Sequence, residues 1–389
     1  MVQCKLKDNL GDHPFWRTED QKKDQPTIPK MIEEILEFKK IWDRFLKNIK
    51  DESRAYVEEQ LKEIEIAFFV SVQVEEGIGM GTQEEDSDEK LPKDKVREDT
   101  EKILEDLKRI ELEEKTAKHN FDYKRTKSVE TVLDTYRKGK EKHHKPAAKN
   151  EEELTNLYKA RKYLKQLIQL EQNDQKFSQL LELDIIKTTH EILMENLLEG
   201  KSGQPGHFSK SQRFGSFKGK EHHYPHIPDD KVTTDILTAL VDCYNSSVDK
   251  QKREIDELNS KTLQQIFQSA AKFLFIFLQL HPFSDGNGRL GRLLCSYFLE
   301  LICPFPSSIY NVYSPTEKSD YVKVLVAARE GIEFNVTLNN KSEGLDFFGK
   351  LYDHDESNMT ALIIESNWFS WKKFINVLQK KFKNECILM

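Results

Sequence analysis

The 389-residue sequence has only five cysteines, and no two of them have the spacing of a disulfide pair or a metal site. They are Cys4, Cys243, Cys295, Cys303 and Cys386. The first residues contain no apolar signal-peptide core, and no apolar run is long enough to span a membrane. We therefore expect a cytoplasmic location, without a disulfide scaffold and without a membrane-spanning segment.

The chain also has no excess of positive charge, because its 60 Lys and Arg residues are outnumbered by 67 Asp and Glu residues. The formal net charge is −7 at pH 7, which argues against nucleic acid as the main partner. Hydrophobic residues make up 37% of the chain and charged residues 33%. This composition is polar for a compact protein, so some stretches are expected to lie outside the core.

Apolar residues recur at helical spacing through most of the chain. Such runs occur at residues 31–69, 154–170, 180–197, 232–245, 259–280, 290–302 and 315–330. The alternation and central Gly of residues 214–224 predict a short β-hairpin. Residues 70–75 also alternate and, on pattern alone, indicate a strand. The sequence thus predicts an all-α fold with one β-hairpin.

Composition divides the chain into five segments. Residues 1–30 are polar and predict a loose tail. Residues 31–77 predict two helices, and residues 78–149 predict a charged insert that is partly helical and solvated. Residues 150–335 form the predicted helical core, and residues 336–389 form a C-terminal extension.

The most informative stretch is HPFSDGNGRLGR, from His281 to Arg292. It joins an apolar helical run to a second helical run. Gly286, Asn287 and Gly288 allow unusual backbone angles and the close approach of a ligand. If the second helix begins there, its unpaired N–H groups and its positive dipole end form an anion site that suits phosphate.

Side chains in this stretch supply the other parts of a phosphate site. Arg289 and Arg292 share one face of the first helical turn and suit phosphate oxygens. Asp285 is a hard oxygen ligand for Mg²⁺, and His281 suits the removal of a proton from an attacking hydroxyl. Together they predict phosphoryl or nucleotidyl transfer. The alternative is an ordinary helix start with a capping Asp, two solvated arginines and a core histidine.

The same stretch matches every fixed position of HPFx(D/E)GNGRxxR, and the chain therefore resembles the Fic family. The resemblance implies a Fic-type helical core over residues 150–335. It also implies a protein adenylyltransferase that moves AMP from ATP and Mg²⁺ to a Ser, Thr or Tyr hydroxyl of another protein.

Roles within the motif follow from the resemblance, position by position. His281 would be the general base and Asp285 the metal ligand, while Phe283 would pack into the core. The implied phosphate-binding residues are Gly286, Asn287 and Gly288 for the α-phosphate, and Arg289 and Arg292 for the β- and γ-phosphates.

The resemblance extends to two elements outside the motif. Tyr321 lies where an aromatic residue is expected beside the nucleotide. Arg329 stands where Asn is common, which leaves the ribose and adenine contacts open. The hairpin corresponds to a flap that docks the target segment as an added strand. The resemblance therefore implies that target docking involves Phe214, Gly215, Ser216 and Phe217.

A fragment of the family's inhibitory motif, (S/T)xxxE(G/N), occurs before the core. Ser71 and Glu75 fit SxxxE, but Glu76 stands where Gly or Asn is expected. The resemblance implies that the glutamate pairs with Arg292 and displaces the γ-phosphate, so we expect autoinhibition. Glu76 is the alternative pairing residue.

The C-terminal CILM, which begins at Cys386, has the form of a farnesylation signal. Just before it, one helical face carries Trp371, Ile375, Leu378 and Phe382. Nearby lysines add positive charge. Because one lipid chain anchors only marginally, we expect this basic, apolar face to be the second membrane signal. The alternative is an ordinary terminal helix with an accidental cysteine.

The expected partners are ATP, a hydroxyl-bearing protein substrate and the cytosolic face of a membrane; nucleic acid is not among them. Another phosphate donor, such as UTP or CDP-choline, and removal of AMP are alternatives at the same site. A non-catalytic nucleotide-binding membrane scaffold is the alternative from another class, and the intact His281 and Asp285 argue against it. Nothing in the sequence decides the oligomeric state, so a homodimer stays open.

Overall fold

The structure, a computed structural model, is mainly helical. It describes residues 10–76, 97–98, 100–106, 149–173, 180–198, 203–217, 219–254, 258–309, 313–316 and 318–383. The described strands are β1 (Phe214–Phe217) and β2 (Lys220–His223), which pair antiparallel. The predicted all-α class with one short hairpin is therefore confirmed.

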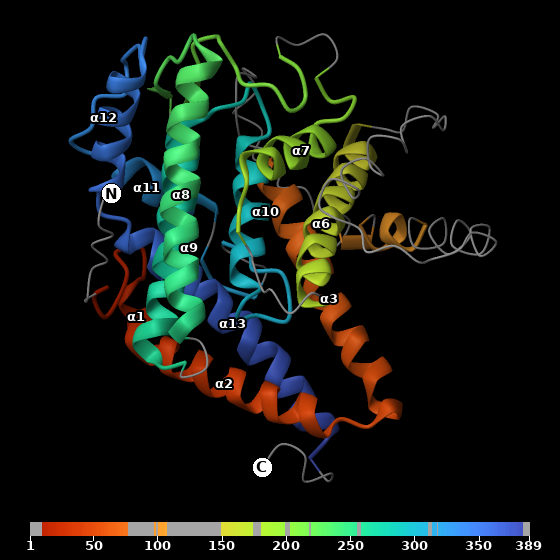
Figure 1. The fold of residues 1–389 in the computed structure, drawn as a ribbon. Coiled ribbons are helices and arrows are strands. Elements are labelled where there is room, and N and C mark those ends of the chain that lie inside the picture. Colours follow the sequence, from red (N-terminus) through yellow and green to blue (C-terminus); the bar gives the residue numbers. More distant parts are fainter. Residues whose placement is uncertain are drawn as a thin grey trace, which may run out of the picture.

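Helix α9 (Ser260–Leu280) lies at the centre of the fold (Figure 1). Asn259 caps its start, because the side-chain oxygen accepts from the N–H groups of Lys261 and Thr262, each at 3.0 Å. Every residue from 266 to 280 is buried, in keeping with the apolar composition of this run. The helices packed against it are α2 (Ile28–Asn48), α8 (Asp230–Glu254), α10 (Asn287–Leu299), α12 (Lys341–Tyr352) and α13 (Ser357–Lys381).

Helix α10 follows α9 after a short turn and packs against helices from the first half of the chain. These are α3 (Asp51–Glu76), α6 (Lys149–Asn173) and α7 (Leu183–Leu193). Residues 70–75 belong to α3, so the strand indicated by their alternation is wrong. Val70 and Val72 are both buried on this helix, and a short alternating run does not distinguish a helix from a strand.

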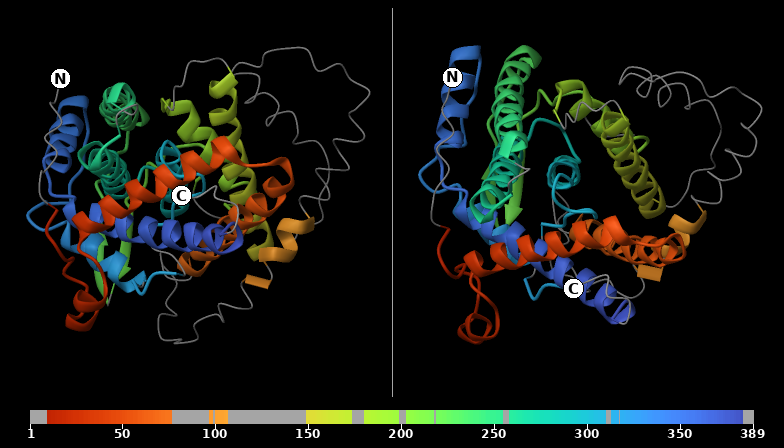
Figure 2. Two further views of the ribbon diagram at one scale, coloured as in Figure 1. Left: turned by 90° about the horizontal axis from the view of Figure 1, so that it is seen from below. Right: turned by 60° about the horizontal axis from the view of Figure 1, so that its bottom comes forward.

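Helices α2 and α13 come from opposite ends of the sequence and run side by side across the lower face (Figure 2). Aromatic rings join them: Trp42 lies 5.2 Å from Phe374, and Phe45 lies 5.1 Å from Phe382, between ring centroids. The described helices share one hydrophobic core that includes both. The terminal segments are thus part of the same globule as the central helices.

The apolar face of the last helix is buried inside the protein. Its members are Trp371, Ile375, Leu378 and Phe382. The prediction that this face docks on a membrane is therefore wrong, because an apolar stripe predicts burial without saying against what. The lysines at 372, 373, 380, 381 and 383 are exposed. Cys386 lies outside the described residues, and its prenylation stays a prediction.

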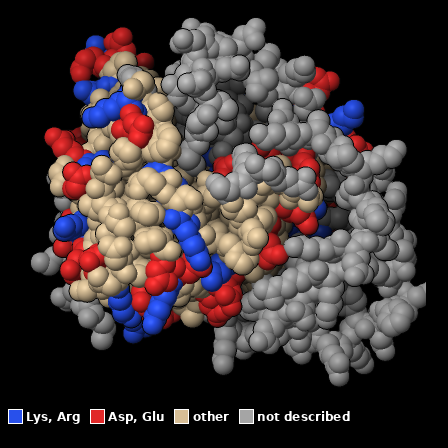
Figure 3. Space-filling view, turned by 90° about the horizontal axis from the view of Figure 1, so that it is seen from above, with Lys and Arg blue, Asp and Glu red and all other residues tan. Residues whose placement is uncertain are grey.

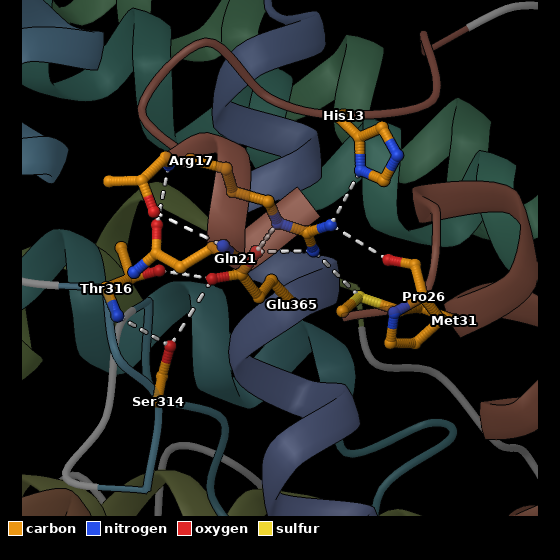
Figure 4. A network of polar contacts seen from close by, with 9 residues as sticks. His13, Arg17, Gln21, Pro26, Met31, Ser314, Thr316 and Glu365 are labelled. Atoms are coloured by element: carbon orange, nitrogen blue, oxygen red, sulfur yellow. Dashed lines mark hydrogen bonds and ion pairs between the residues drawn. The ribbon is translucent and has the colours of Figure 1, made fainter. Parts of the chain in front are cut away.

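Residues 10–30 are folded, although their polar composition predicted a loose tail. Helix α1 (Glu19–Asp24) begins at a capping box formed by Thr18 and Gln21. Arg17 is buried in a polar network beside α13 (Figure 4), where its guanidinium pairs with Glu365 at 2.6 Å. The prediction is wrong for these residues because a single buried ion pair leaves no periodic signal in the sequence.

The described part of the charged insert also contacts the helical core. Arg97 forms ion pairs with Glu63 of α3 and with Glu101. Leu104, in a helical segment at 100–106, is buried. A fully solvated helix was expected there, and this contact corrects that expectation for the described residues. Residues 107–148 of this predicted insert lie outside the described part.

The remaining helix, α11 (Lys318–Ala327), packs against α13. No helix in the described ranges is both long and apolar enough to cross a membrane. Seen from above, the described surface is covered mostly by neutral side chains, with Lys and Arg interspersed among Asp and Glu (Figure 3). Charges of both signs therefore share this face.

Candidate active site

The predicted motif forms the turn between α9 and α10. Helix α9 ends at His281, whose backbone is left-handed with φ 49° and ψ 56°. Helix α10 begins at Asn287, after Gly286 with φ 75°, and no side chain of a described residue caps this start. The first N–H groups of a helix have no intrahelical acceptor. The uncapped start therefore presents donors to an anion, as the sequence predicted.

His281 is 6% exposed, and burial together with the Arg213 guanidinium lowers its pKa to about 3. The ring is consequently neutral at physiological pH. Its Nδ1 lies 3.4 Å from the Leu278 carbonyl oxygen. Because a carbonyl can only accept, Nδ1 carries the proton and Nε2 keeps its lone pair. Nε2 has no hydrogen-bond partner among the described residues, so this nitrogen is placed to accept a proton.

Asn287 holds the turn together rather than presenting its amide to a ligand. Its Oδ1 accepts from the Phe283 N–H at 3.0 Å, and its Nδ2 donates to the Phe283 carbonyl at 2.9 Å. The residue is completely buried. Only its backbone N–H, at the start of α10, is in a position to serve the predicted phosphate contact. Phe283 is buried in the core, as expected.

His190 of α7 supports the turn from the other side, and sequence reasoning missed it. Its Nδ1 accepts from the Gly206 N–H at 2.8 Å, and its Nε2 lies 3.0 Å from the Asp285 carbonyl oxygen. Its ring stacks on Phe283 at 3.8 Å between centroids. Burial lowers its pKa to about 4, so the neutral ring accepts at Nδ1 and donates at Nε2. A lone histidine in an amphipathic helix gives no signal of this role.

The backbone at Gly286 admits only glycine. A Cβ there would lie 2.5 Å from the Sδ of Met194, and the φ of 75° is unfavourable for other residues. The Gly286 N–H donates to Asp285 Oδ1 at 2.7 Å. This hydrogen bond orients the Asp285 carboxylate, which is the predicted metal ligand.

Both motif arginines are buried on α10, each 5% exposed. Arg289 is surrounded by carboxylates, because its Nη2 lies 3.8 Å from Asp285 and its Nη1 lies 3.7 Å from Glu153 of α6. Phosphate oxygens would replace these acceptors with stronger, bidentate ones. The guanidinium of Arg289 is thus already held beside the uncapped helix start.

The β-hairpin lies beside the turn, as predicted. Gly215 pairs with His222 in its ladder, and Phe214, which pairs with His223, is 48% exposed. Tyr224, the residue after β2, stacks on the His281 ring with 3.9 Å between centroids and 13° between planes. Sequence reasoning did not assign Tyr224 a role. The hairpin position is confirmed, and target docking by residues 214–217 stays a prediction.

Two further arginines that the motif does not contain lie close to His281. Arg213 precedes β1 and is buried, and Arg329 follows α11. Positive charge on each lowers the pKa of His281. Arg329 was noted only as a departure from the family pattern. Tyr321 is buried on α11, and its contact with a nucleotide stays a prediction.

The proposed inhibitory residues belong to α3. The Ser71 hydroxyl is buried and donates to the Ala67 carbonyl at 2.8 Å. Glu75 follows one turn later, and its side chain lies outside the described part. Helix α3 packs against α10, which carries Arg292. The two helices are therefore neighbours, while the pairing of Glu75 with Arg292 stays a prediction.

Residues 180–299 match the family model of the Fic/DOC family. A Fido domain-containing protein of Dictyostelium discoideum is 25% identical over 128 residues, which are 33% of this chain and 73% of that protein. A ribonucleoside-diphosphate reductase small chain of Ostreid herpesvirus 1 is 23% identical over 145 residues, 37% of this chain. This chain spans only 22% of that viral protein.

Among solved structures, a Fic domain-containing signalling protein from Bacteroides thetaiotaomicron superposes with a TM-score of 0.50. It is 16% identical, and the match covers 88% of this chain and 98% of that one. At this identity the likeness concerns the fold.

Proposed function

Since residues 180–299 form a Fic-type domain, we propose that this Fic-type transferase is a protein adenylyltransferase. It moves AMP from ATP to a Ser, Thr or Tyr hydroxyl of a protein. The observation that carries the proposal is the turn from His281 to Asn287. A neutral imidazole with an available Nε2 begins it, and an uncapped helix N-terminus beside a buried Arg289 ends it.

In the proposed reaction, the hydroxyl oxygen attacks the α-phosphorus while Nε2 of His281 accepts the hydroxyl proton. The bond between the α-phosphorus and the bridging oxygen breaks, and pyrophosphate leaves. The triphosphate brings negative charge beside the imidazole. Negative charge raises the pKa of a neighbouring histidine, so bound ATP makes His281 a better base than it is without ligand.

The N-terminus of α10 suits the phosphates of ATP. Backbone N–H groups and the helix dipole favour an anion there, and Arg289 and Arg292 add two buried positive charges. Donors that are fixed before the reaction stabilise the charge that develops on the transferred phosphate. Gly286 and Gly288 have no side chains that would block a close approach.

Asp285 fits one ligand position of a Mg²⁺ ion. Mg²⁺ in nucleotide sites is commonly held by one or two carboxylates together with phosphate oxygens and water. The Asp285 side chain is partly exposed, and its Oδ1 is oriented by the Gly286 N–H. When bound, the ion would neutralise charge on the leaving phosphates. The nearby Arg289 shares that task.

Autoinhibition is the second part of the proposal, and the position of α3 supports it. Arg161 of α6 lies 2.7 Å from Glu300, at the end of α10, and 4.0 Å from Glu65 of α3. Helix α3 continues ten residues beyond Glu65 to Glu75, about 15 Å. Arg292 precedes Glu300 by eight residues, about 12 Å. Measured along their helices, the two positions are thus at similar distances from the same ion cluster.

Transfer of a labelled group tests the proposed reaction. The protein is incubated with Mg²⁺ and with ATP labelled at either the α- or the γ-phosphate, and self-modification is followed by gel and mass spectrometry. Retention of the α-label, with the mass of one AMP group, is the expected result. Retention of the γ-label would instead indicate phosphoryl transfer. Parallel incubations with UTP and CDP-choline test other donors, and absence of all labels contradicts the proposal.

A further inference from the structure

The ring of His281 is held by the hairpin as well as by its own helix. Tyr224 stacks on it with nearly parallel planes. The Tyr224 N–H donates to the Arg213 carbonyl at 3.0 Å, which closes the base of the hairpin. The residue that contacts the proton acceptor is therefore built into the hairpin itself.

Two guanidinium groups, the buried Arg213 and the partly buried Arg329, fix this base of the hairpin. Arg213 donates to the Ser209 carbonyl at 3.0 Å and to the Pro225 carbonyl at 2.7 Å. These bonds clip the segment before β1 to the segment after β2. Because both hydrogen bonds come from one planar guanidinium group, the two backbone segments have little freedom to rotate relative to each other.

Arg329 connects the same base to the central helix. Its Nη1 donates to Gln279 Oε1 of α9 at 2.7 Å, and its Nη2 donates to the His223 carbonyl of β2. The guanidinium also lies over the Phe334 ring at 3.7 Å and over the Tyr224 ring at 5.3 Å. The Tyr224 ring therefore lies close to both Arg329 and His281.

The charged groups that face His281 come from three segments. Arg213 precedes the hairpin, Arg329 follows α11, and Asp285 lies in the turn. Burial is the main cause of the low pKa of His281, the two guanidinium groups lower it further, and Asp285 raises it. The arrangement therefore favours the neutral imidazole that a proton acceptor requires.

We propose that Tyr224, clamped by Arg213 and Arg329, is a positioning residue for His281. It fixes the plane of the imidazole so that Nδ1 stays at the Leu278 carbonyl and Nε2 stays available. It also joins the proton acceptor to the hairpin, so a displacement of the hairpin rotates the ring. The catalytic role of Tyr224 rests on the proposed function. Its restraint on the His281 ring does not depend on that function.

The first test compares Tyr224→Leu with Tyr224→Phe in the transfer assay. Loss of the aromatic face should lower kcat about 10- to 100-fold, as misplaced catalytic groups do. The KM for ATP should change little, because the phosphate donors belong to α10. Tyr224→Phe keeps the face and should recover most of the lost rate. Equal rates for both variants, or a change confined to KM, would overturn the proposal.

The second test measures the environment of the His281 ring directly and does not depend on activity. NMR of protein with labelled histidine follows the His281 signals during a pH titration. In Tyr224→Leu these signals should shift and broaden, and in Arg329→Met the pKa should rise by about one unit, because a positive neighbour is removed. Arg253→Met is the matched control, since it removes the same charge from an exposed position on α8 and should leave His281 unchanged.

The two tests separate the two proposals. If the wild type transfers no label but the His281 signals respond to Tyr224→Leu and Arg329→Met, the restraint stands and the proposed function falls. If the wild type is active but the ring signals in both variants match those of the wild type, the positioning role falls. The folded state of each variant is checked by its far-UV circular dichroism spectrum.

Discussion

Arg17 and Glu365 form a buried ion pair although 348 positions separate them in the sequence. The Arg17 Nε donates to Glu365 Oε2 at 2.8 Å, and its Nη1 donates to the Pro26 carbonyl at 2.8 Å. On the other side of the carboxylate, the Thr316 hydroxyl donates to Oε1. The pair therefore joins three segments: the N-terminal residues, the segment before α11, and α13.

Removing one member of this pair should destabilise the fold. Arg17→Met leaves the Glu365 carboxylate buried without its charge partner, which typically costs about 3–5 kcal/mol. Urea denaturation followed by circular dichroism measures the loss. The double variant Arg17→Met, Glu365→Leu removes both charges and should lose less than the sum of the two single changes. Additive losses would mean that the pair makes no coupled contribution.

His281→Ala should abolish transfer while leaving ATP binding nearly intact. The imidazole acts on the attacking hydroxyl, and its loss as a general base typically costs about 100- to 10,000-fold in rate. Labelled transfer measures the rate, and calorimetric titration with ATP measures binding. His354→Ala, a partly buried histidine outside the turn, is the control. Full activity of His281→Ala would remove the assigned role.

Two substitutions at Asp285 separate metal binding from support of the turn. Asp285→Asn keeps an oxygen for the Gly286 N–H but lacks the negative charge, whereas Asp285→Ala loses both. The Asn variant should need more Mg²⁺ for the same rate, and excess Mg²⁺ should restore part of its activity. Titration of the rate with Mg²⁺ measures this. Undiminished transfer in the presence of a chelator contradicts a metal role for Asp285.

Gly286→Ala should disrupt the turn and inactivate the protein. The new Cβ would lie 2.5 Å from Met194 Sδ, at a backbone φ of 75°. The left-handed backbone alone costs about 1–2 kcal/mol for a residue with a Cβ. Adding Met194→Ala should relieve the clash but not the backbone cost, so recovery should be partial.

Gly349→Ala provides the matched control for that substitution. Gly349 lies in helix α12, and no atom of the described residues lies within 4 Å of the position that its Cβ would take. The alanine should stabilise the protein by about 0.5–1 kcal/mol, as expected inside a helix. Thermal unfolding of both variants measures the contrast. Equal stability of the Gly286 and Gly349 variants would show that the turn tolerates a side chain.

Glu75→Gly should raise self-modification. If the Glu75 carboxylate competes with the γ-phosphate for Arg292, a charge-assisted bond worth roughly 1.5–3 kcal/mol is lost, which corresponds to about a ten- to a hundredfold change in occupancy. Glu75→Asp should raise the rate less, because a shorter carboxylate keeps part of the interaction. Initial rates of labelled transfer at fixed ATP compare the variants.

Glu76→Gly is the control that shows whether Glu75 or Glu76 is the inhibitory glutamate. Activation by Glu76→Gly alone would assign the pairing to Glu76. If neither substitution changes the rate, α3 has only a packing role beside α10.

Much of the fold was predictable because its determinants are periodic. The apolar run at 263–280 predicts a buried helix, and α9 is buried over almost its whole length. The turn was predictable because glycine and charged residues stand at fixed positions in it. The hairpin was predictable from its central Gly219 and the short alternating runs on either side.

The supporting residues could not be predicted, since their roles depend on contacts between distant segments. His190 bonds to Gly206 and to Asp285, which is 95 positions away. Arg329 bonds to the backbone of His223, 106 positions away. Neither residue stands in a recognisable spacing. Without the fold, each is an ordinary polar residue, and the apolar face at Trp371 is equally suited to a membrane or to another helix.

The pairing of α2 with α13 has a consequence for the synthesis of the chain. Apolar residues of α2, among them Trp42 and Phe45, are covered by a helix that ends 333 residues after α2 does, at Lys381. At roughly 5–20 residues per second, the ribosome needs on the order of 15–70 s to add that length. During this interval a nascent chain carries a finished helix whose partner does not yet exist. Holding chaperones therefore have their greatest opportunity at the N-terminal end, and a ribosome stalled before residue 357 would leave that surface open.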